Sequence, residues 1–197
     1  MAKCQNAVPA WIMPINKALE SLNPRNNHFD VVIIDEASQS DISSLAILYM
    51  GKKMIIVGDD KQVSPLGIGT DTEKIHSLKQ MYLNNVIPNA HLYDAKTSIY
   101  DLAATTFQPL MLREHFRCVP DIIGFSNFLS YDYKIKPLRD ESSSNLFPAV
   151  VNYRVSNGER IGKTNPAEAK VIVALMRACM EQPEYQGKTF GIISLLG

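Results

Sequence analysis

The sequence predicts an α/β protein that contains short parallel strands, and three segments carry this prediction. Residues 31–34 form an uncharged β-branched run, Val-Val-Ile-Ile, of the kind found in strands buried on both faces of a parallel sheet. Residues 54–57 form a second short apolar run and predict a second buried strand. Residues 40–50, between the two runs, have the pattern of a helix.

The helix predicted between the strands has recognisable ends. Ser40 or Asp41 is suited to cap its start, and Gly51 is suited to stop it. Its apolar face is expected to consist of Ile42, Leu45, Ala46 and Tyr49. A strand–helix–strand crossover places its two strands parallel, so the carboxyl ends of both strands are expected at the same edge of the sheet.

Polar side chains follow both strands at this edge. Asp35 and Glu36 come directly after the first run, although a buried strand does not normally end on paired acids, because carboxylates need water, a metal or a cation. Ligands bind at the carboxyl edge of an α/β sheet, where Asp35 is suited to hold Mg²⁺ through its water shell and Glu36 to take a proton from an attacking water. Gly58 permits a sharp turn after the second run, and Gln62 beyond it is suited to sense a terminal phosphate or to orient a water. The alternative is that both polar segments are solvated turns, with Gln62 exposed to water.

These segments resemble the motifs of a known enzyme family. Asp-Glu-Ala-Ser-Gln at residues 35–39 and Gly-Asp-Asp-Lys-Gln-Val-Ser-Pro at residues 58–65 resemble motifs II and III of superfamily 1 helicases. The Asp-Glu-Ala-Ser-Gln form is typical of the Upf-like branch. Residues 165–169 and 191–194 resemble, more weakly, the Asn-x-x-Glu-Ala helix of that family and the strand after it.

A further block completes the resemblance. Residues 112–117, followed by residues 120–127 and Tyr131, are similar to motif IV of the same branch, with Phe116 in place of the usual Tyr. Phe116 keeps the aromatic ring and loses the hydroxyl group. The order and spacing of the blocks match the family across about residues 30–197.

The resemblance implies a fold and a mechanism. It implies parts of two RecA-like parallel-sheet domains of the P-loop NTPase fold, both incomplete, at residues 1–107 and 108–197. ATP is then expected to bind between the domains, with Mg²⁺ held near Asp35 through water, as the family implies. Glu36 is expected to activate the attacking water, and Gln62 is expected to report the presence of the γ-phosphate.

The same resemblance assigns a role to Arg117. This residue matches the arginine with which the family's second domain reaches the γ-phosphate; the structural alternative is an ion pair with Glu114 or Asp121. The implied enzyme hydrolyses ATP and moves along or unwinds a single strand of DNA or RNA. Travel from 5′ to 3′ is suggested by analogy with the Upf-like branch.

Several motifs of the family have no counterpart in this sequence. The phosphate-binding loop, Gly-x-x-x-x-Gly-Lys-Ser/Thr, is not found before Val31, and the Gly-Lys-Thr segments at residues 162–164 and 187–189 have no glycine five positions earlier. The later motifs V and VI are also missing. We therefore expect the chain to be a fragment of a larger helicase that does not hydrolyse ATP by itself.

The motifs allow two other interpretations. A degenerate helicase that acts as an ATP-controlled binding or scaffold module is the main alternative, although it need not keep Glu36. An unrelated NTPase, such as a signalling GTPase, is disfavoured because the blocks around Gln62 and Arg117 have the helicase layout.

Composition restricts the class of protein without specifying a function. Hydrophobic residues make up 46% of the chain, and 20 basic residues balance 20 acidic ones, so no global charge attracts nucleic acid. Cys4, Cys118 and Cys179 lack Cys-x-x-Cys spacing, which argues against a zinc site and a disulfide framework and favours a reducing, cytoplasmic location. The apolar stretch at residues 7–15 is too short to cross a bilayer, and no membrane association is expected.

The remaining elements are predicted from local signals. Helices are expected at residues 72–83, from Ser98 with a capping box, and at residues 120–129 and 166–180. The last helix is expected to turn Val171, Val173, Leu175 and Met176 inward. Strands are expected at residues 149–155 and 190–195, a mobile loop at residues 140–145, and Trp11 in the core rather than stacked on a base.

Overall fold

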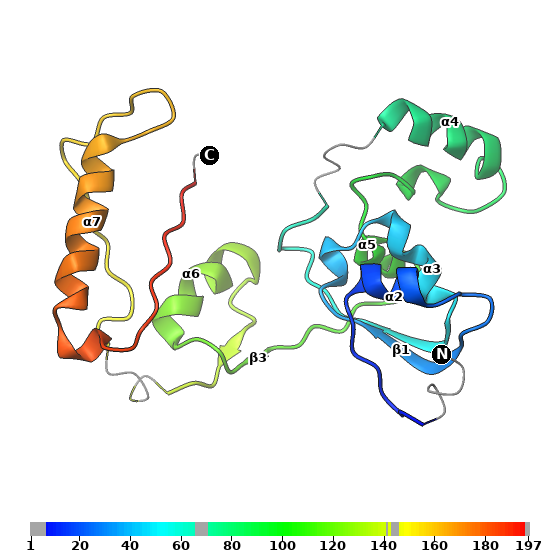
Figure 1. The fold of residues 1–197 in the computed structure, drawn as a ribbon, viewed down its shortest axis with the longest axis horizontal. Coiled ribbons are helices and arrows are strands. Elements are labelled where there is room, and N and C mark those ends of the chain that lie inside the picture. Colours follow the sequence, from blue (N-terminus) through cyan, green and yellow to red (C-terminus); the bar gives the residue numbers. More distant parts are fainter. Residues whose placement is uncertain (1–6, 66–70, 141, 143–145, 196–197) are drawn as a thin grey trace. The chain divides into compact units, whose positions relative to one another are not determined.

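A computed structural model describes residues 7–65, 71–140, 142 and 146–195. The chain divides into two compact units, Met1–Leu110 and Met111–Gly197, and the sequence placed the boundary between residues 107 and 108. Short parallel sheets combine with helices in the described residues, which confirms the α/β class (Figure 1). This architecture is consistent with incomplete RecA-like P-loop domains.

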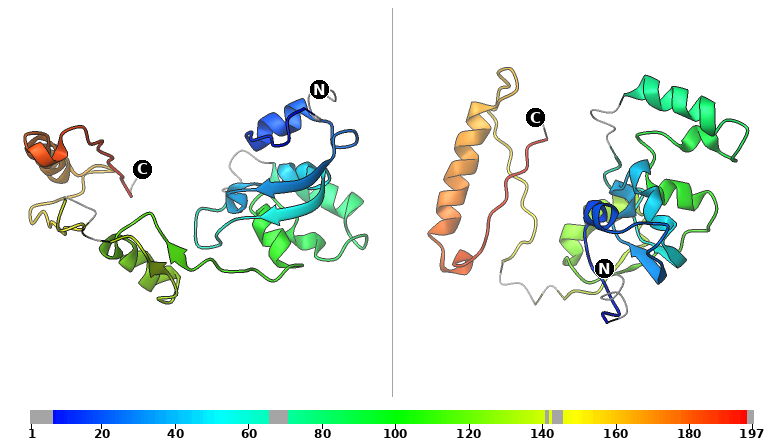
Figure 2. Two further views of the ribbon diagram at one scale, coloured as in Figure 1. Left: turned by 90° about the horizontal axis from the view of Figure 1, so that it is seen from below. Right: turned by 45° about the vertical axis from the view of Figure 1, so that its right-hand side comes forward.

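The first unit is built on the predicted crossover. Strand β1 (Phe29–Ile34) pairs in parallel with β2 (Gly51–Ile56), in a register that runs from Phe29 opposite Gly51 to Ile34 opposite Ile56 (Figure 2). The strands therefore end at the same edge, as the sequence predicted.

The expectation that both strands are buried on two faces is wrong for this chain. Ile34 is 3% exposed, whereas its neighbour Ile33 is 64% exposed and Ile55 on β2 is 50% exposed. Successive side chains of a strand point to opposite faces, so one face of this sheet packs on the core and the other is open. A strand is buried on both faces only where helices cover both sides of its sheet, and the described helices leave one side open.

The connection between the strands is shorter and tighter than predicted. It consists of a 3-10 helix (Ile42–Ser44), capped by the Asp41 carboxylate, and α3 (Leu45–Leu48). The expected apolar face is partly wrong, since Ala46 and Tyr49 are exposed. The buried positions are Ser44, Ile47 and Met50. A 3-10 helix has three residues per turn instead of 3.6, so different residues after it face the core than in a continuous α-helix.

Three helices complete the core of this unit. Buried residues of α2 (Ile15–Ser21), α3 and α5 (Ile99–Ala104) pack with residues of the sheet edge in a single cluster: Ala18, Leu22, Ile34, Ala37, Ile47, Met50 and Ile99. The predicted helix at residues 72–83 is α4 (Thr72–Tyr82), capped by Asp71, and a 3-10 helix follows at Ala90–Leu92. Trp11 is half-buried, and its indole N–H donates to the carbonyl of Val8 at 3.0 Å.

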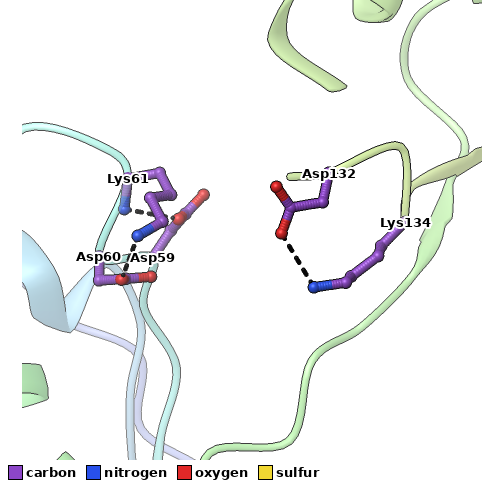
Figure 3. Close-up of polar contacts among 5 residues, drawn as sticks. All are labelled: Asp59, Asp60, Lys61, Asp132 and Lys134. Carbon is purple, nitrogen blue, oxygen red and sulfur yellow. Dashed lines mark hydrogen bonds and ion pairs between the residues drawn. The ribbon is translucent and has the colours of Figure 1, made fainter. Parts of the chain in front are cut away.

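The second unit begins with another parallel pair around a helix. The short strands β3 (Glu114–His115) and β4 (Lys136–Pro137) flank α6 (Pro120–Ser130), the predicted helix that starts at a proline. Asn127 is buried on α6, and its side-chain amide donates to the carbonyl of Ile135 at 2.9 Å and accepts from the N–H of the same residue at 3.0 Å. The loop between α6 and β4 also contains an ion pair of Lys134 with Asp132, at 3.0 Å (Figure 3).

The last part of the chain departs from the prediction in two ways. Helix α7 (Pro166–Met180) has the predicted bounds, but Val173 and Leu175 are 50% and 46% exposed instead of inward. Residues 149–155 and 190–195 are not strands. Residues 190–193 instead line a shallow apolar groove with α7, because a strand needs a hydrogen-bonded partner and the described residues supply none here.

The other predictions concern residues 140–145 and membrane spans. The predicted loop at residues 140–145 falls largely outside the described residues. A 3-10 helix follows α7 at Pro183–Tyr185. Across the described ranges, no helix is both long enough and apolar enough to cross a membrane.

Candidate active site

The acidic pair lies at the carboxyl end of β1 in a sharply turned backbone. Asp35 and Glu36 are both exposed, and Glu36 adopts the left-handed conformation with φ 53° and ψ 37°. The Asp35 carboxylate accepts the N–H of Glu36 at 3.0 Å. A 3-10 helix (Ala37–Gln39) follows, and the Gln39 amide donates to the Glu36 carboxylate at 3.1 Å. The turn therefore directs both carboxylates away from the core into solvent.

The loop after β2 leaves the sheet beside the acidic pair. The parallel ladder continues past the strand ends, because the N–H of Val57 donates to the carbonyl of Ile34 and the N–H of Ala37 donates to the carbonyl of Val57, both at 2.8 Å. The two polar loops thus start from adjacent positions at one edge of the sheet.

Asp59 organises the second loop. Its carboxylate accepts the backbone N–H of Lys61 at 2.9 Å and the side-chain amide of Gln62 at 2.9 Å. Its carbonyl accepts the N–H of Gln62 at 3.2 Å. Lys61 pairs in turn with Asp60 at 2.9 Å (Figure 3). Gln62 is therefore held by Asp59 in a defined position, although both Gln62 and Lys61 are exposed.

Ser38 and Gly58 join the two loops. Ser38 is 2% exposed, and its hydroxyl oxygen accepts the N–H of Asp59 at 3.4 Å. A Cβ atom on Gly58 would lie 2.8 Å from Cδ2 of Tyr100 and 3.0 Å from the backbone nitrogen of Ser38. The sequence suggested that Gly58 is needed for a sharp turn. The structure shows instead that glycine is needed because the backbone lies so close to its neighbours.

Asp35 is suited to a magnesium site in which the protein supplies few of the ligands. Mg²⁺ usually keeps several waters and binds one or two carboxylates together with substrate phosphates, so one exposed carboxylate at a phosphate site suits it. Among the described residues, no group of three or more His, Cys, Asp or Glu side chains is arranged to hold a metal. The oxygens of a phosphate would therefore have to complete the coordination.

Arg117 lies in the second unit, between β3 and α6. The preceding turn is fixed by the N–H of Cys118, which donates to Nε2 of His115 at 3.0 Å, and by Arg139, which donates to the carbonyl of Arg117 at 2.7 Å. Arg117 is exposed, and within the described part of the chain its side chain forms no ion pair with Glu114 or Asp121.

The structure thus places three of the four predicted site residues at one sheet edge: Asp35, Glu36 and Gln62. Arg117 belongs to the other unit, and its approach to them stays a prediction. The sequence did not single out Tyr100, whose ring contacts Gly58. The capping box at Ser98 predicted a helix there, but it does not reveal what the next residues touch.

Comparisons with known proteins relate this chain to helicases. A family described as an AAA domain matches residues 15–69. The mouse 5′-3′ DNA helicase ZGRF1 is 26% identical over 163 residues, which cover 77% of this chain and 8% of that protein. The DNA replication ATP-dependent helicase/nuclease DNA2 of Saccharomyces cerevisiae is 31% identical over 132 residues, 66% of this chain and 8% of that protein.

A bacterial relative covers nearly the whole chain. The uncharacterized ATP-dependent helicase MG140 homolog of Mycoplasma pneumoniae is 26% identical over 188 residues, 94% of this chain and 16% of that protein. The chain therefore spans between 8% and 16% of the length of these three relatives. Together, the matched family and these relatives support a relationship to superfamily 1 AAA-type helicases, with this chain corresponding to a part of such a protein.

Proposed function

We propose that this chain is part of an ATP-dependent helicase or translocase of the Upf-like branch, called the intact protein below. The observation that carries the proposal is the position of the two polar loops, which leave adjacent parallel strands at the same edge and are joined through Ser38 and Asp59. This edge is where α/β sheets bind their ligands. The relatives named as ATP-dependent helicases favour ATP as that ligand.

Each proposed site residue has a distinct task in ATP hydrolysis. Asp35 would hold Mg²⁺ through water, and Glu36 would accept the proton of the attacking water. Gln62, positioned by Asp59, would orient that water or contact the γ-phosphate. Arg117 would approach from the second unit and stabilise charge in the transition state, a contribution on the order of 10³ to 10⁵ in rate in other phosphoryl-transfer enzymes. Mg²⁺ held there would neutralise charge on the phosphates.

The exposed surface supports the view that further protein covers this chain. Apolar side chains on one face of the β1–β2 sheet are exposed, including Ile33 on β1 and Ile55 on β2. A sheet face of this kind is normally covered in α/β proteins.

The proposed track is single-stranded DNA. One relative is named a 5′-3′ DNA helicase and another a DNA replication ATP-dependent helicase/nuclease. Because the charge of this chain is balanced, we assign most phosphate contacts to other parts of the intact protein. Cys118 and Cys179 are free thiols, which suits the proposed reducing, cytoplasmic location.

ATP turnover and strand displacement by the intact protein test the proposal. We expect both activities on a DNA track, and an RNA track serves as the comparison. Glu36→Gln should lower turnover by about 10² to 10⁴ with ATP binding retained, because it removes only the proton acceptor. Arg117→Ala should abolish turnover with little loss of ATP binding. Nucleotide binding without turnover in the unmodified protein would favour the degenerate scaffold module instead.

A further inference from the structure

The start of α5 is fixed firmly to the loop that carries the acidic pair. Ser98 and Asp101 form a capping box, in which the Ser98 hydroxyl accepts the N–H of Asp101 at 3.1 Å and the Asp101 carboxylate accepts the N–H of Ser98 at 2.9 Å. The N–H of Ile99 donates to the carbonyl of Ser40 at 3.0 Å, and the Ile99 side chain is fully buried. Tyr100 lies between Ile99 and Asp101, so its backbone is held rigidly by these contacts.

The ring of Tyr100 is in close contact with the loop after β2. A Cβ atom on Gly58 would lie 2.8 Å from Cδ2 and 3.1 Å from Cγ of this ring, so the ring rests directly against the glycine backbone. Tyr100 is half-buried and also packs against the core of the unit. Burial and the nearby charges of Asp60 and Asp59 raise the pKa of Tyr100, with a smaller contribution from Asp101 and an opposing one from Lys61. The ring thus lies beside the same turn that holds Gln62.

Ser38 borders the same point beside Gly58 as the ring. The backbone nitrogen of Ser38 would lie 3.0 Å from a Cβ atom on Gly58, and the buried Ser38 hydroxyl accepts the N–H of Asp59. The ring and the acidic loop therefore meet where a side chain at residue 58 would begin. The hydrogen bond to Ser38 is long at 3.4 Å, so it cannot fix the turn strongly by itself.

We infer that Tyr100 is a positioning residue for the proposed ATP hydrolysis: its ring packs against Gly58 beside Ser38 and so sets where the Asp59–Gln62 turn lies relative to the acidic pair. This inference rests on the proposed function for its catalytic part. The structural part is independent, because the contacts belong to the chain itself. Tyr100 does not touch the reacting atoms and acts through the turn.

Hydrogen exchange in the 197-residue chain tests the structural part. Tyr100→Ala should speed exchange of the Asp59 and Gln62 amides by about tenfold or more, because local opening of the turn becomes easier. Tyr100→Phe should leave exchange unchanged, since the contact is made by the ring. Ile99→Val is the control, because it weakens the same helix without touching Gly58. Unchanged exchange in the alanine variant would overturn the inference.

Kinetics of the intact protein test the catalytic part. Tyr100→Ala should lower kcat by about 10-fold to 100-fold, the scale of a misplacement of about 1 Å, with KM for ATP nearly constant. Tyr100→Phe and Ile99→Val should both have the kcat of the unmodified protein. An unchanged kcat in the alanine variant, or an equal loss in Ile99→Val, would overturn the positioning role.

A second variant covers the case in which Tyr100→Ala does not fold. Gly58→Ala adds a Cβ atom against the ring and should displace the same turn, with the same faster exchange and the same loss of kcat at constant KM. Normal exchange and normal kcat in Gly58→Ala would contradict the inference. If the unmodified intact protein shows no ATP turnover, the proposed function fails, and hydrogen exchange alone decides whether Tyr100 sets the turn.

Discussion

The buried hydroxyl of Ser38 accepts the backbone N–H of Asp59 at 3.4 Å and so joins the loop after β1 to the loop after β2. The first loop carries the acidic pair, and the second carries Gln62, whose amide is held by Asp59 at 2.9 Å. The Ser38 hydroxyl thus connects groups from two separate sequence motifs, in addition to the backbone hydrogen bond from Ala37 to Val57. This connection gives a structural reason for a serine inside the Asp-Glu-Ala-Ser-Gln segment.

Replacing this serine tests the connection. Ser38→Ala removes the acceptor of the Asp59 N–H in a buried position and should lower the free energy of unfolding of the 197-residue chain by about 1 kcal/mol. Urea denaturation measures this difference. Ser64→Ala, at an exposed position of the other motif, is the control and should change stability by less than about 0.5 kcal/mol. Equal effects of the two substitutions would show that the Ser38 hydroxyl has no special role.

The left-handed backbone of Glu36 predicts an unusual order of stabilities. An L-residue in this conformation costs about 1 to 2 kcal/mol, whereas glycine adopts it without penalty. Glu36→Gly should therefore be more stable than Glu36→Ala by about 1 kcal/mol, although both variants lack the carboxylate and its bond to Gln39. Thermal or urea unfolding of the two variants measures the difference. If the alanine variant is as stable as the glycine variant, the backbone at residue 36 is not left-handed.

The hydrogen bonds to Asp94 predict that the stability of the folded chain depends on pH. Burial alone would raise the pKa of Asp94, but hydrogen bonds from the N–H of Lys96 at 2.8 Å and from the N–H and hydroxyl of Thr97 at 2.9 Å outweigh it and lower the pKa. A carboxyl whose pKa is lower in the folded state stabilises that state above the unfolded pKa of about 4 and loses this contribution as the pH falls through the folded value.

The comparison with Asp94→Asn isolates this group. The wild-type chain should be more stable than the variant at pH 7, and the difference should shrink as the pH falls below about 4. Urea denaturation at several pH values between neutrality and pH 3 measures it. A difference that stays constant over this range would mean that the Asp94 charge does not stabilise the turn before α5.

The open sheet face predicts a contrast between two adjacent isoleucines. In the 197-residue chain, Ile34→Ala should lower the free energy of unfolding by about 2 to 5 kcal/mol, because Ile34 is buried, whereas Ile33→Ala should have little effect. In the intact protein we expect Ile33→Ala to become nearly as costly, because further structure is proposed to cover that face. Thermal unfolding of both forms measures the contrast. A neutral Ile33→Ala in the intact protein would mean that this face stays open.

The sequence predicted best what local signals determine. The helices expected at residues 72–83, 120–129 and 166–180 lie close to the observed bounds, and α6 begins at Pro120 as predicted. The parallel pairing of β1 and β2 also followed from sequence, because a short helical connection permits few alternatives. The positions of Asp35, Glu36 and Gln62 at one edge follow from that pairing alone.

Features that depend on distant partners were predicted poorly. Residues 149–155 and 190–195 have apolar runs typical of strands, yet a strand forms only where a neighbouring strand accepts its hydrogen bonds. Tyr100 illustrates the same limit for the site, because its contact with Gly58 joins residues that lie far apart in the sequence. Neither the spacing of a motif nor the cap of a helix contains that information.

A structure of the intact protein with Mg²⁺ and a non-hydrolysable ATP analogue is the most direct test of the account. The measurement is the distance from the γ-phosphate to each of the four side chains proposed to act on it: Asp35, Glu36, Gln62 and Arg117. The account predicts that all four surround the phosphate, with Asp35 reaching it through the hydrated metal. A nucleotide bound elsewhere, or an Arg117 side chain directed to a different surface, would contradict the proposed mechanism.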